Sequence, residues 1–191
     1  QRQTIMSWRQ TVMAALAADN SPLWVFGYGS LMWRPNFAHD DIVDARLYGF
    51  HRAPCIYSYH HRGTKDNPGL VMGLDWGGSC RGRALCVAAQ DAPGVLDYLH
   101  EREMISGVYV PSLRPIHLSG GTVQMGLCFV VEHDHVQYAG GLDFDSQAAL
   151  VRHGIGPSGK CIDYFAATVE HLDDMGIHDA LLHRLLNAAR A

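Results

Sequence analysis

A stretch of glycines and polar residues follows the first strongly apolar run of the sequence, and its backbone could bind a negatively charged group. The stretch is Phe26-Gly27-Tyr28-Gly29-Ser30-Leu31. Glycines without a Cβ let backbone N–H groups approach a ligand, and successive amides in such a turn can hold a carboxylate or an oxyanion. A nucleotide loop is not indicated, because the third glycine of GxGxxG, the lysine of a Walker sequence and a following helical pattern are all missing. By its spacing alone, the segment fits a plain tight turn after a strand better than a binding site.

A carboxylate near the end of a predicted helix could supply general-base chemistry. The helical pattern covers 92–104, and at about 100° per residue Glu103 shares a face with Leu96 and Leu99. This face points toward the core, where lost hydration should raise the pKa of the carboxylate and make it a stronger base. The alternative is a frayed helix end at which Glu103 forms an ion pair with an arginine, for example Arg34 or Arg52.

The two motifs together resemble the ChaC-like γ-glutamylcyclotransferase family, over most of residues 23–185. Residues 24–35, Trp-Val-Phe-Gly-Tyr-Gly-Ser-Leu-Met-Trp-Arg-Pro, are similar to the family's substrate-loop signature almost letter for letter. Residues 99–103, Leu-His-Glu-Arg-Glu, with Gly-Val-Tyr at 107–109, are similar to the segment that carries its catalytic glutamate. Shorter similar pieces lie at 61–64, 67–71, 78–82, 156–159 and 163–164.

This resemblance implies a cofactor-free enzyme that cleaves glutathione by internal cyclisation, releasing 5-oxoproline and Cys-Gly. The substrate's own α-amine is the nucleophile, so no covalent enzyme intermediate is needed. Glu103 takes the role of general base and acid, while the glycine-rich amides bind the α-carboxylate or the oxyanion. The implied substrate-binding residues are Val25, Phe26, Gly27, Tyr28, Gly29, Ser30, Leu31, Tyr109 and Tyr138, the last from the short segment Tyr138-Ala139-Gly140. Hydroxyl donors could come from Tyr28, Tyr109, Tyr138 and Tyr164, or these rings could simply pack against the sheet.

Three other functions remain open on the sequence. A cyclotransferase for γ-glutamylamines or γ-glutamyl amino acids would use the same loop and base. A non-catalytic protein that binds γ-glutamyl metabolites could keep the loop without turnover. A thiol enzyme would need Cys55 or Cys161 as nucleophile, although no local pattern supports one.

Closely spaced strand patterns, followed by helical ones, predict an α+β fold with a mostly antiparallel sheet or barrel and flanking helices. We expect a helix or tail at 1–20 and a single domain at 21–191. Glycine pairs at 77–78 and 120–121 predict turns between strands. The expected strands are Leu23–Phe26, Ala45–Tyr57, Leu70–Trp76, Gly82–Ala89, Val108–Leu118 and Thr122–Glu132. The expected helices are Ala92–Met104, Asp145–His153, Ile162–Leu172 and His178–Ala189.

Composition limits the classes of partner. The chain has 191 residues, 48% of them hydrophobic, and a net charge of −4, which gives no basic surface for nucleic acid. Its cysteines are odd in number and widely spaced, which is typical of reduced buried thiols. The histidines show no typical metal-ligand spacing, although the segments His60-His61 and His133-Asp134-His135 contain residue types that can bind a metal. No apolar run approaches the ~18 residues that cross a bilayer, so we expect a cytoplasmic protein that binds a small molecule and no metal.

Overall fold

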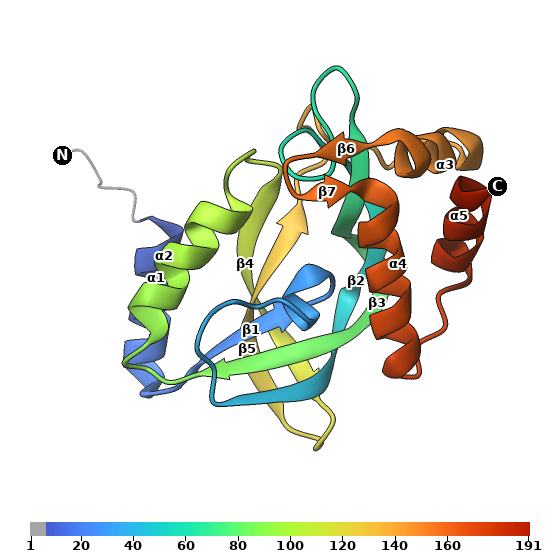
Figure 1. Ribbon diagram of the computed structural model, residues 1–191. Coiled ribbons are helices and arrows are strands. Elements are labelled where there is room, and N and C mark those ends of the chain that lie inside the picture. The colour runs from blue at the N-terminus through green and yellow to red at the C-terminus, as the bar shows by residue number, and fades with distance from the viewer. Residues whose placement is uncertain (1–6) are drawn as a thin grey trace.

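A closed five-stranded barrel forms the centre of the protein in the computed structural model, which describes residues 7–191 (Figure 1). Around the barrel the strands run in the order β1-β3-β2-β4-β5. Their bounds are β1 Leu23–Gly27, β2 Asp41–Ser58, β3 Gly69–Val87, β4 Tyr109–Leu118 and β5 Val123–Val131. Neighbouring strands are antiparallel except where β1 and β3 meet β5 in short parallel pairings. The α+β class and the mostly antiparallel barrel predicted from the sequence are therefore confirmed.

One turn predicted from the sequence is wrong. The patterns at 70–76 and 82–89 belong to one continuous strand, β3, and Gly77-Gly78 does not separate them. These glycines have φ angles of 96° and 69°, and they lie where the register with β2 shifts between Tyr48 and Phe50. The two strands stay paired on both sides, so the glycines form a bulge that bends the hairpin. The other glycine pair does connect β4 to β5, with Gly121 at a φ of 87°.

Helices cover two sides of the barrel (Figure 1). Helices α1 and α2 lie together on one side, and α3, α4 and α5 lie on the other. Their bounds are α1 Trp8–Asp19, α2 Ala92–Glu103, α3 Phe144–His153, α4 Cys161–Asp174 and α5 Ala180–Arg190, with a small hairpin of β6 Ile155–Gly156 and β7 Gly159–Lys160. A 3₁₀ helix at Ser30–Met32, which the sequence pattern does not predict, follows β1. No helix among residues 7–191 is both long enough and apolar enough to span a bilayer.

Helix α1 belongs to the region expected to be a helix or tail. Its Ser7 N-cap forms a capping box with Gln10, and Val12 and Leu16 are buried. The Trp8 indole donates a hydrogen bond to His100 Nδ1 of α2 at 3.3 Å. The His100 side chain therefore interacts with α1. Residues 1–6 of the expected region lie outside the described residues.

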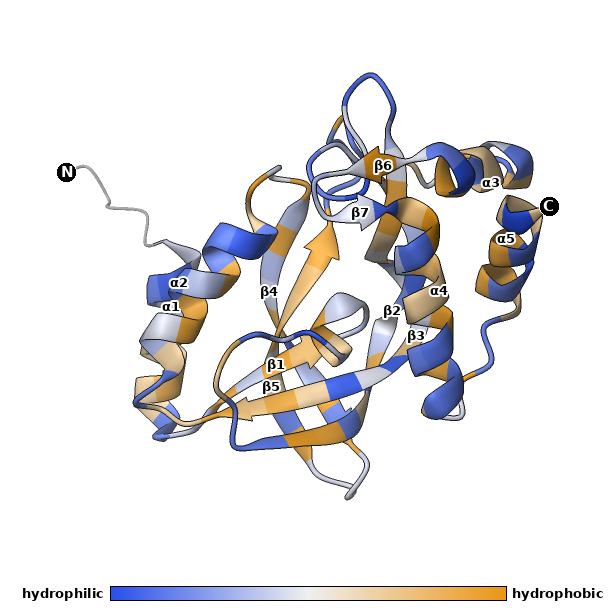
Figure 2. Cartoon of the chain, in the orientation of Figure 1, coloured by the Kyte–Doolittle hydropathy of each residue, from blue (hydrophilic) through white to orange (hydrophobic). Residues whose placement is uncertain are grey.

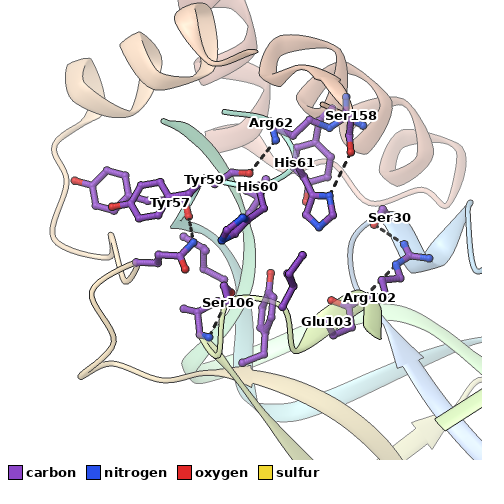
Figure 3. Close-up of a pocket in the computed structure, with 18 of the residues that line it drawn as sticks. Ser30, Tyr57, Tyr59, His60, His61, Arg62, Arg102, Glu103, Ser106 and Ser158 are labelled. Carbon is purple, nitrogen blue, oxygen red and sulfur yellow. Dashed lines mark hydrogen bonds and ion pairs between the residues drawn. The ribbon is translucent and has the colours of Figure 1, made fainter. Parts of the chain in front are cut away.

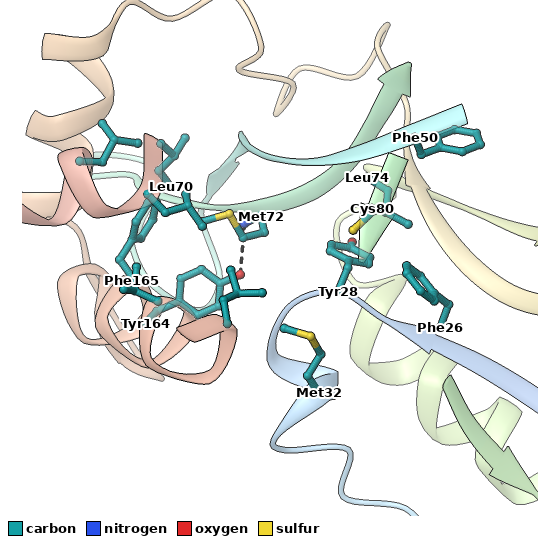
Figure 4. Packing of buried hydrophobic residues seen from close by; sticks show 14 of the residues in the cluster. Phe26, Tyr28, Met32, Phe50, Leu70, Met72, Leu74, Cys80, Tyr164 and Phe165 are labelled. Carbon is teal, nitrogen blue, oxygen red and sulfur yellow. Dashed lines mark hydrogen bonds between the residues drawn. The ribbon is translucent and has the colours of Figure 1, made fainter. Parts of the chain in front are cut away.

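Apolar side chains anchor both helix layers to the barrel. Figure 2 shows hydrophobic residues concentrated along the strands, β1 and β5 above all. One buried cluster fills the barrel around Phe26 and Leu74 and continues to Phe165 of α4 (Figure 4). A second cluster joins Leu96 and Leu99 of α2 to the strands and to α1. Burial of these faces fixes the C-terminal end of α2 next to the segment after β1.

Candidate active site

The end of α2 and the segment after β1 meet at a cavity of about 340 Å³, which we call the main cavity (Figure 3). Arg102 and Glu103 line one side of it, and Tyr57 to Arg62 line the other. A smaller space of about 40 Å³, the inner cavity, is lined by residues 28–31 together with Glu103, Tyr109 and Tyr164. The last three residues line both cavities, together with Ser30, so the two spaces adjoin there.

Glu103 is the last residue of α2, and its carboxylate is largely withdrawn from water. The side chain is only 16% exposed. Burial raises the pKa of Glu103, and the positive charge of Arg102 partly opposes this shift. Arg102 Nε lies 3.2 Å from Glu103 Oε1. Both sequence interpretations thus hold in part, because Glu103 faces the barrel and also pairs with an arginine, which is its own neighbour.

Arg102 ties α2 to the loop after β1. Its guanidinium donates to Ser30 Oγ at 2.9 Å and to the carbonyls of Arg34 and Pro35 at 2.7 and 3.1 Å. A planar guanidinium donates several hydrogen bonds in fixed directions, so a lysine at this position could not hold the loop in the same way. Arg102 was not predicted as a functional residue, although its position directly before Glu103 in the Leu-x-x-Arg-Glu segment was a usable signal.

The loop after β1 presents backbone donors to the inner cavity. Ser30 and Leu31 open the 3₁₀ helix, so their N–H groups have no helical acceptor. Within residues 7–191 these two N–H groups donate no hydrogen bond. Arg52 Nε holds the loop from behind by donating to the Tyr28 carbonyl at 2.6 Å. Free amides on a braced loop can bind a carboxylate or an oxyanion.

Buried phenols complete the inner cavity. Tyr28 donates to the Phe129 carbonyl at 3.3 Å and Tyr109 to the Met72 carbonyl at 3.1 Å. Burial raises the pKa of Tyr28 and of Tyr109 well above the usual value, and the nearby Glu103 carboxylate acts in the same direction on both. Both phenols therefore stay neutral at physiological pH.

Tyr164 differs from the other two phenols because its oxygen accepts a hydrogen bond. The Met72 N–H donates to it at 3.2 Å (Figure 4). Burial raises the pKa of Tyr164 to about 12, so it keeps its proton. Among the described residues the hydroxyl has no acceptor, which leaves its O–H available to a ligand.

Not every residue predicted from the sequence reaches the cavities. Tyr28 to Leu31 and Tyr109 do, together with Glu103. Val25, Phe26 and Gly27 lie in β1 and line neither cavity, because the two side chains are fully buried in the barrel and support the loop from below. Tyr138 also lines neither, since its hydroxyl donates to Asp75 at 2.9 Å and its ring stacks on His133. The neighbouring Gln137 lines the main cavity in its place.

The far side of the main cavity, which we call the outer arm, is formed by His60, His61, Arg62 and Ser158. The Ser158 N–H donates to the His61 carbonyl at 2.9 Å, and His61 Nδ1 lies 3.2 Å from Ser158 Oγ. Burial lowers the pKa of His61, and the nearby charges of His60, Arg102 and Arg62 act in the same direction. The outer arm therefore combines a neutral imidazole with a guanidinium, which suits an anionic or peptide-like ligand group.

The thiol alternative finds no support in this geometry. Cys55 and Cys161 are buried and line neither cavity. Burial raises the pKa of Cys55 to about 12 and that of Cys161 to about 11, so neither forms the reactive thiolate. All the cysteines are free, in line with the expectation of reduced thiols.

A family model described as ChaC-like protein matches residues 23–191, which includes every residue of the two cavities. The chain belongs to the ChaC-like family. It is 32% identical over 172 residues to the glutathione-specific γ-glutamylcyclotransferase of Escherichia coli, covering 90% of this chain and 74% of that protein. It is 30% identical over 182 residues to the enzyme of the same name from Schizosaccharomyces pombe, covering 84% and 88%.

The fold of this ChaC-like protein is shared with a solved structure. A crystal structure of the yeast γ-glutamyl cyclotransferase specific to glutathione superposes with a TM-score of 0.82. The match covers 90% of this chain and 96% of that chain at 24% sequence identity. At this level of identity the comparison confirms the barrel and its helices, and the chemistry is argued from the site itself.

Proposed function

We propose that this ChaC-like protein is a γ-glutamylcyclotransferase that converts glutathione to 5-oxoproline and Cys-Gly. The observation that carries the proposal is the meeting of a buried carboxylate, Glu103, with the free N–H groups of Ser30 and Leu31 at one cavity. The names of the similar bacterial and fission yeast proteins support glutathione as the substrate.

The γ-glutamyl end of the substrate binds where the two cavities adjoin. Its α-carboxylate accepts hydrogen bonds from the Ser30 and Leu31 amides, because a full negative charge gains most from preorganised N–H donors. The free O–H of Tyr164 then faces the side-chain carbonyl. Its hydrogen bond strengthens as negative charge develops on that oxygen during attack.

Glu103 carries the proton through the reaction. The α-ammonium has a reference pKa near ~8 and must lose a proton before its nitrogen can attack. Glu103 takes this proton, the amine attacks the γ-carbonyl carbon, and a five-membered ring closes. The bond to the cysteinyl nitrogen then breaks, and Glu103 returns the proton to the departing amine. The ring nitrogen gives up its second proton to solvent, which leaves 5-oxoproline as the neutral lactam. Because the nucleophile is internal, much of the entropic cost of bringing two reactants together is avoided.

The outer arm receives the Cys-Gly part of the substrate. His61 and Arg62 offer hydrogen-bond donors to its peptide group and terminal carboxylate. A γ-glutamylamine lacks that carboxylate, so it would leave the Arg62 guanidinium, which donates to the Lys160 carbonyl, without an anionic partner. This difference favours the peptide over the amine as substrate.

The direct test is incubation of the purified full chain with glutathione, following 5-oxoproline and Cys-Gly together. Equal amounts of the two products are expected. Saturable binding of glutathione with no 5-oxoproline over hours would establish a binding protein instead. A γ-glutamylamine and γ-glutamylalanine are assayed in parallel. Faster turnover of either would show that it, and not glutathione, is the preferred substrate.

The remaining expectations are part of the same proposal. A cytoplasmic location agrees with free buried cysteines, which persist in reducing compartments. A net charge of −4 argues against a nucleic-acid partner.

A further inference from the structure

Three potential metal ligands converge on the outer surface of the C-terminal helices, apart from the residues of the cavities. They are Asp173 near the end of α4, His178 in the connection and His183 in α5. Each offers one ligand atom, and these atoms all lie within 4.8 Å of one another. We propose that this cluster binds a zinc ion, joining α4 to α5.

The separations between ligand atoms suit zinc. His183 Nε2 lies 2.9 Å and His178 Nδ1 3.8 Å from Asp173 Oδ1. Tetrahedral coordination with bonds of about 2.0–2.2 Å places ligand atoms about 3.3–3.6 Å from each other. The two observed distances lie on either side of this range, so small side-chain rotations bring the two nitrogens and the oxygen to one ion. Imidazole and carboxylate are ligands that zinc accepts, and water can fill the fourth position.

The backbone holds these ligands without help from an ion. Helix α4 ends in a Schellman motif, in which the Ile177 N–H donates to the Leu172 carbonyl at 2.8 Å and the Gly176 N–H to that of Asp173 at 2.9 Å. Gly176 has a φ of 68°, as this motif requires. Ile177 packs against the main hydrophobic cluster. The position of Asp173 relative to the connection is thereby fixed.

A second cap fixes the histidines. Asp179 is the N-cap of α5, and its carboxylate accepts from the Leu182 N–H at 3.1 Å. His178 and His183 therefore occupy positions N′ and N4, where an apolar pair usually packs as a hydrophobic staple. Here both positions carry imidazoles, with ring centroids 4.3 Å apart, next to a carboxylate. The staple geometry is retained, but the residue types are those of a metal site.

A simpler interpretation is a hydrogen bond between α4 and α5, from His183 to Asp173, without any metal. That interpretation gives His178 only the stacking contact with His183, since its side chain is 70% exposed and its nitrogen is 3.8 Å from the carboxylate. The two interpretations therefore differ in what His178→Ala should do.

The test is titration of Zn²⁺ into the chelator-treated full chain by calorimetry, with His178→Ala, His183→Ala and the control His153→Ala. His153 is an exposed histidine at the end of α3, outside the cluster. We expect one equivalent of Zn²⁺ to bind the wild type and the control, and at least ~10-fold weaker binding in each cluster variant, because each loses a ligand. Zn²⁺ should raise the melting temperature of the wild type, and Mg²⁺, which prefers oxygen ligands, should not.

Circular dichroism on the same variants checks that each is folded. We expect all of them to fold, because the replaced side chains lie at the surface of the helices. Equal Zn²⁺ binding by the wild type and both cluster variants would overturn the proposal. So would the absence of saturable binding to the wild type.

Discussion

At the scale of single residues, the central feature is a carboxylate that the fold deprives of water. Glu103 sits at the end of a helix whose apolar face is buried, so the packing that anchors α2 also desolvates the acid. Its pKa is raised by this burial, and Arg102 limits the rise. The result is a carboxylate that is a stronger base than an exposed one.

Replacement of Glu103 by Gln should remove nearly all turnover while keeping the shape of the site. Loss of a general base typically costs ~10²–10⁴ in rate, so kcat for 5-oxoproline formation should fall by that range. Glu101→Gln is the matched control, because Glu101 is exposed on the same turn of α2. Near-normal kcat in Glu103→Gln would refute the role of this residue.

The fold of that variant can be checked through stability. A raised pKa means that folded Glu103 binds its proton more tightly than the unfolded chain does. The resulting stabilisation is present at low pH and is lost as pH rises through the folded pKa. Glu103→Gln should therefore unfold at the same or a higher temperature than the wild type at pH 8, and a clear drop would point to a structural cause for lost activity.

The same shift predicts a pH profile. Activity should fall on the acidic side as Glu103 is protonated, with a midpoint above the ordinary value of 4.5. On the alkaline side, kcat/KM should fall as the free substrate amine, with a reference pKa near ~8, loses its proton, because Glu103 then has no proton to return to the departing amine. Measuring kcat/KM between pH 4 and 10 tests this bell shape. An acidic limb that persists unchanged in the residual activity of Glu103→Gln would assign it to another group.

At the scale of elements, local patterns predicted the helices and most strands, because these depend on the spacing of apolar residues. The bulge at Gly77-Gly78 was predicted as a turn. Glycines with positive φ occur both in turns and in bulges, and only the pairing of β3 with β2 distinguishes the two. Arg102 was missed for a related reason. Its partners lie at 30–35, and the sequence does not show that this loop returns to α2. The base and loop were predictable because each is a contiguous motif.

Glycines at the outer arm show how two elements are brought together. Gly156 of β6 packs so tightly against the 61–63 segment that a Cβ on it would lie 2.5 Å from the His61 carbonyl oxygen and 2.6 Å from the Gly63 nitrogen. This close backbone contact explains Gly156. Gly63 is required by a different contact, because a Cβ on it would meet the Gly69 nitrogen and the Ser58 carbonyl oxygen. The contact of Gly156 also places Ser158 beside His61.

Gly156→Ala should therefore distort the outer arm. We expect a loss of about 1–3 kcal/mol in the free energy of unfolding, as for other overpacked sites, and a raised KM for glutathione. The matched control is Gly94→Ala in α2, where a Cβ meets nothing within 4 Å. That change should stabilise the protein by up to about 1 kcal/mol. Denaturant unfolding and glutathione kinetics check both variants, and equal stability of the two would contradict the close-contact explanation.

At the scale of the whole molecule, two layers of helices cover the barrel, and the two layers have different roles. The layer of α3, α4 and α5 adjoins the outer arm through β6 and β7, and the layer of α1 and α2 supplies the base. Helix α1 touches α2 on the side away from the cavities, and none of its residues lines them. It therefore supports the catalytic helix from outside.

This arrangement predicts that weakening α1 lowers stability and leaves the chemistry intact. Trp8 packs edge-on against Phe129, with ring centroids 6.0 Å apart, and its indole bonds to His100. Trp8→Ala should cost about 1–3 kcal/mol of unfolding free energy, as is usual for lost packing at a partly buried site. Val136→Ala, at a side chain 77% exposed, is the control and should change little. Because Glu103 is held by Leu96, Leu99 and Arg102, kcat at a temperature where the variant is folded should stay near the wild-type value. A fall in kcat as large as that in Glu103→Gln would mean instead that α1 sets the position of the base.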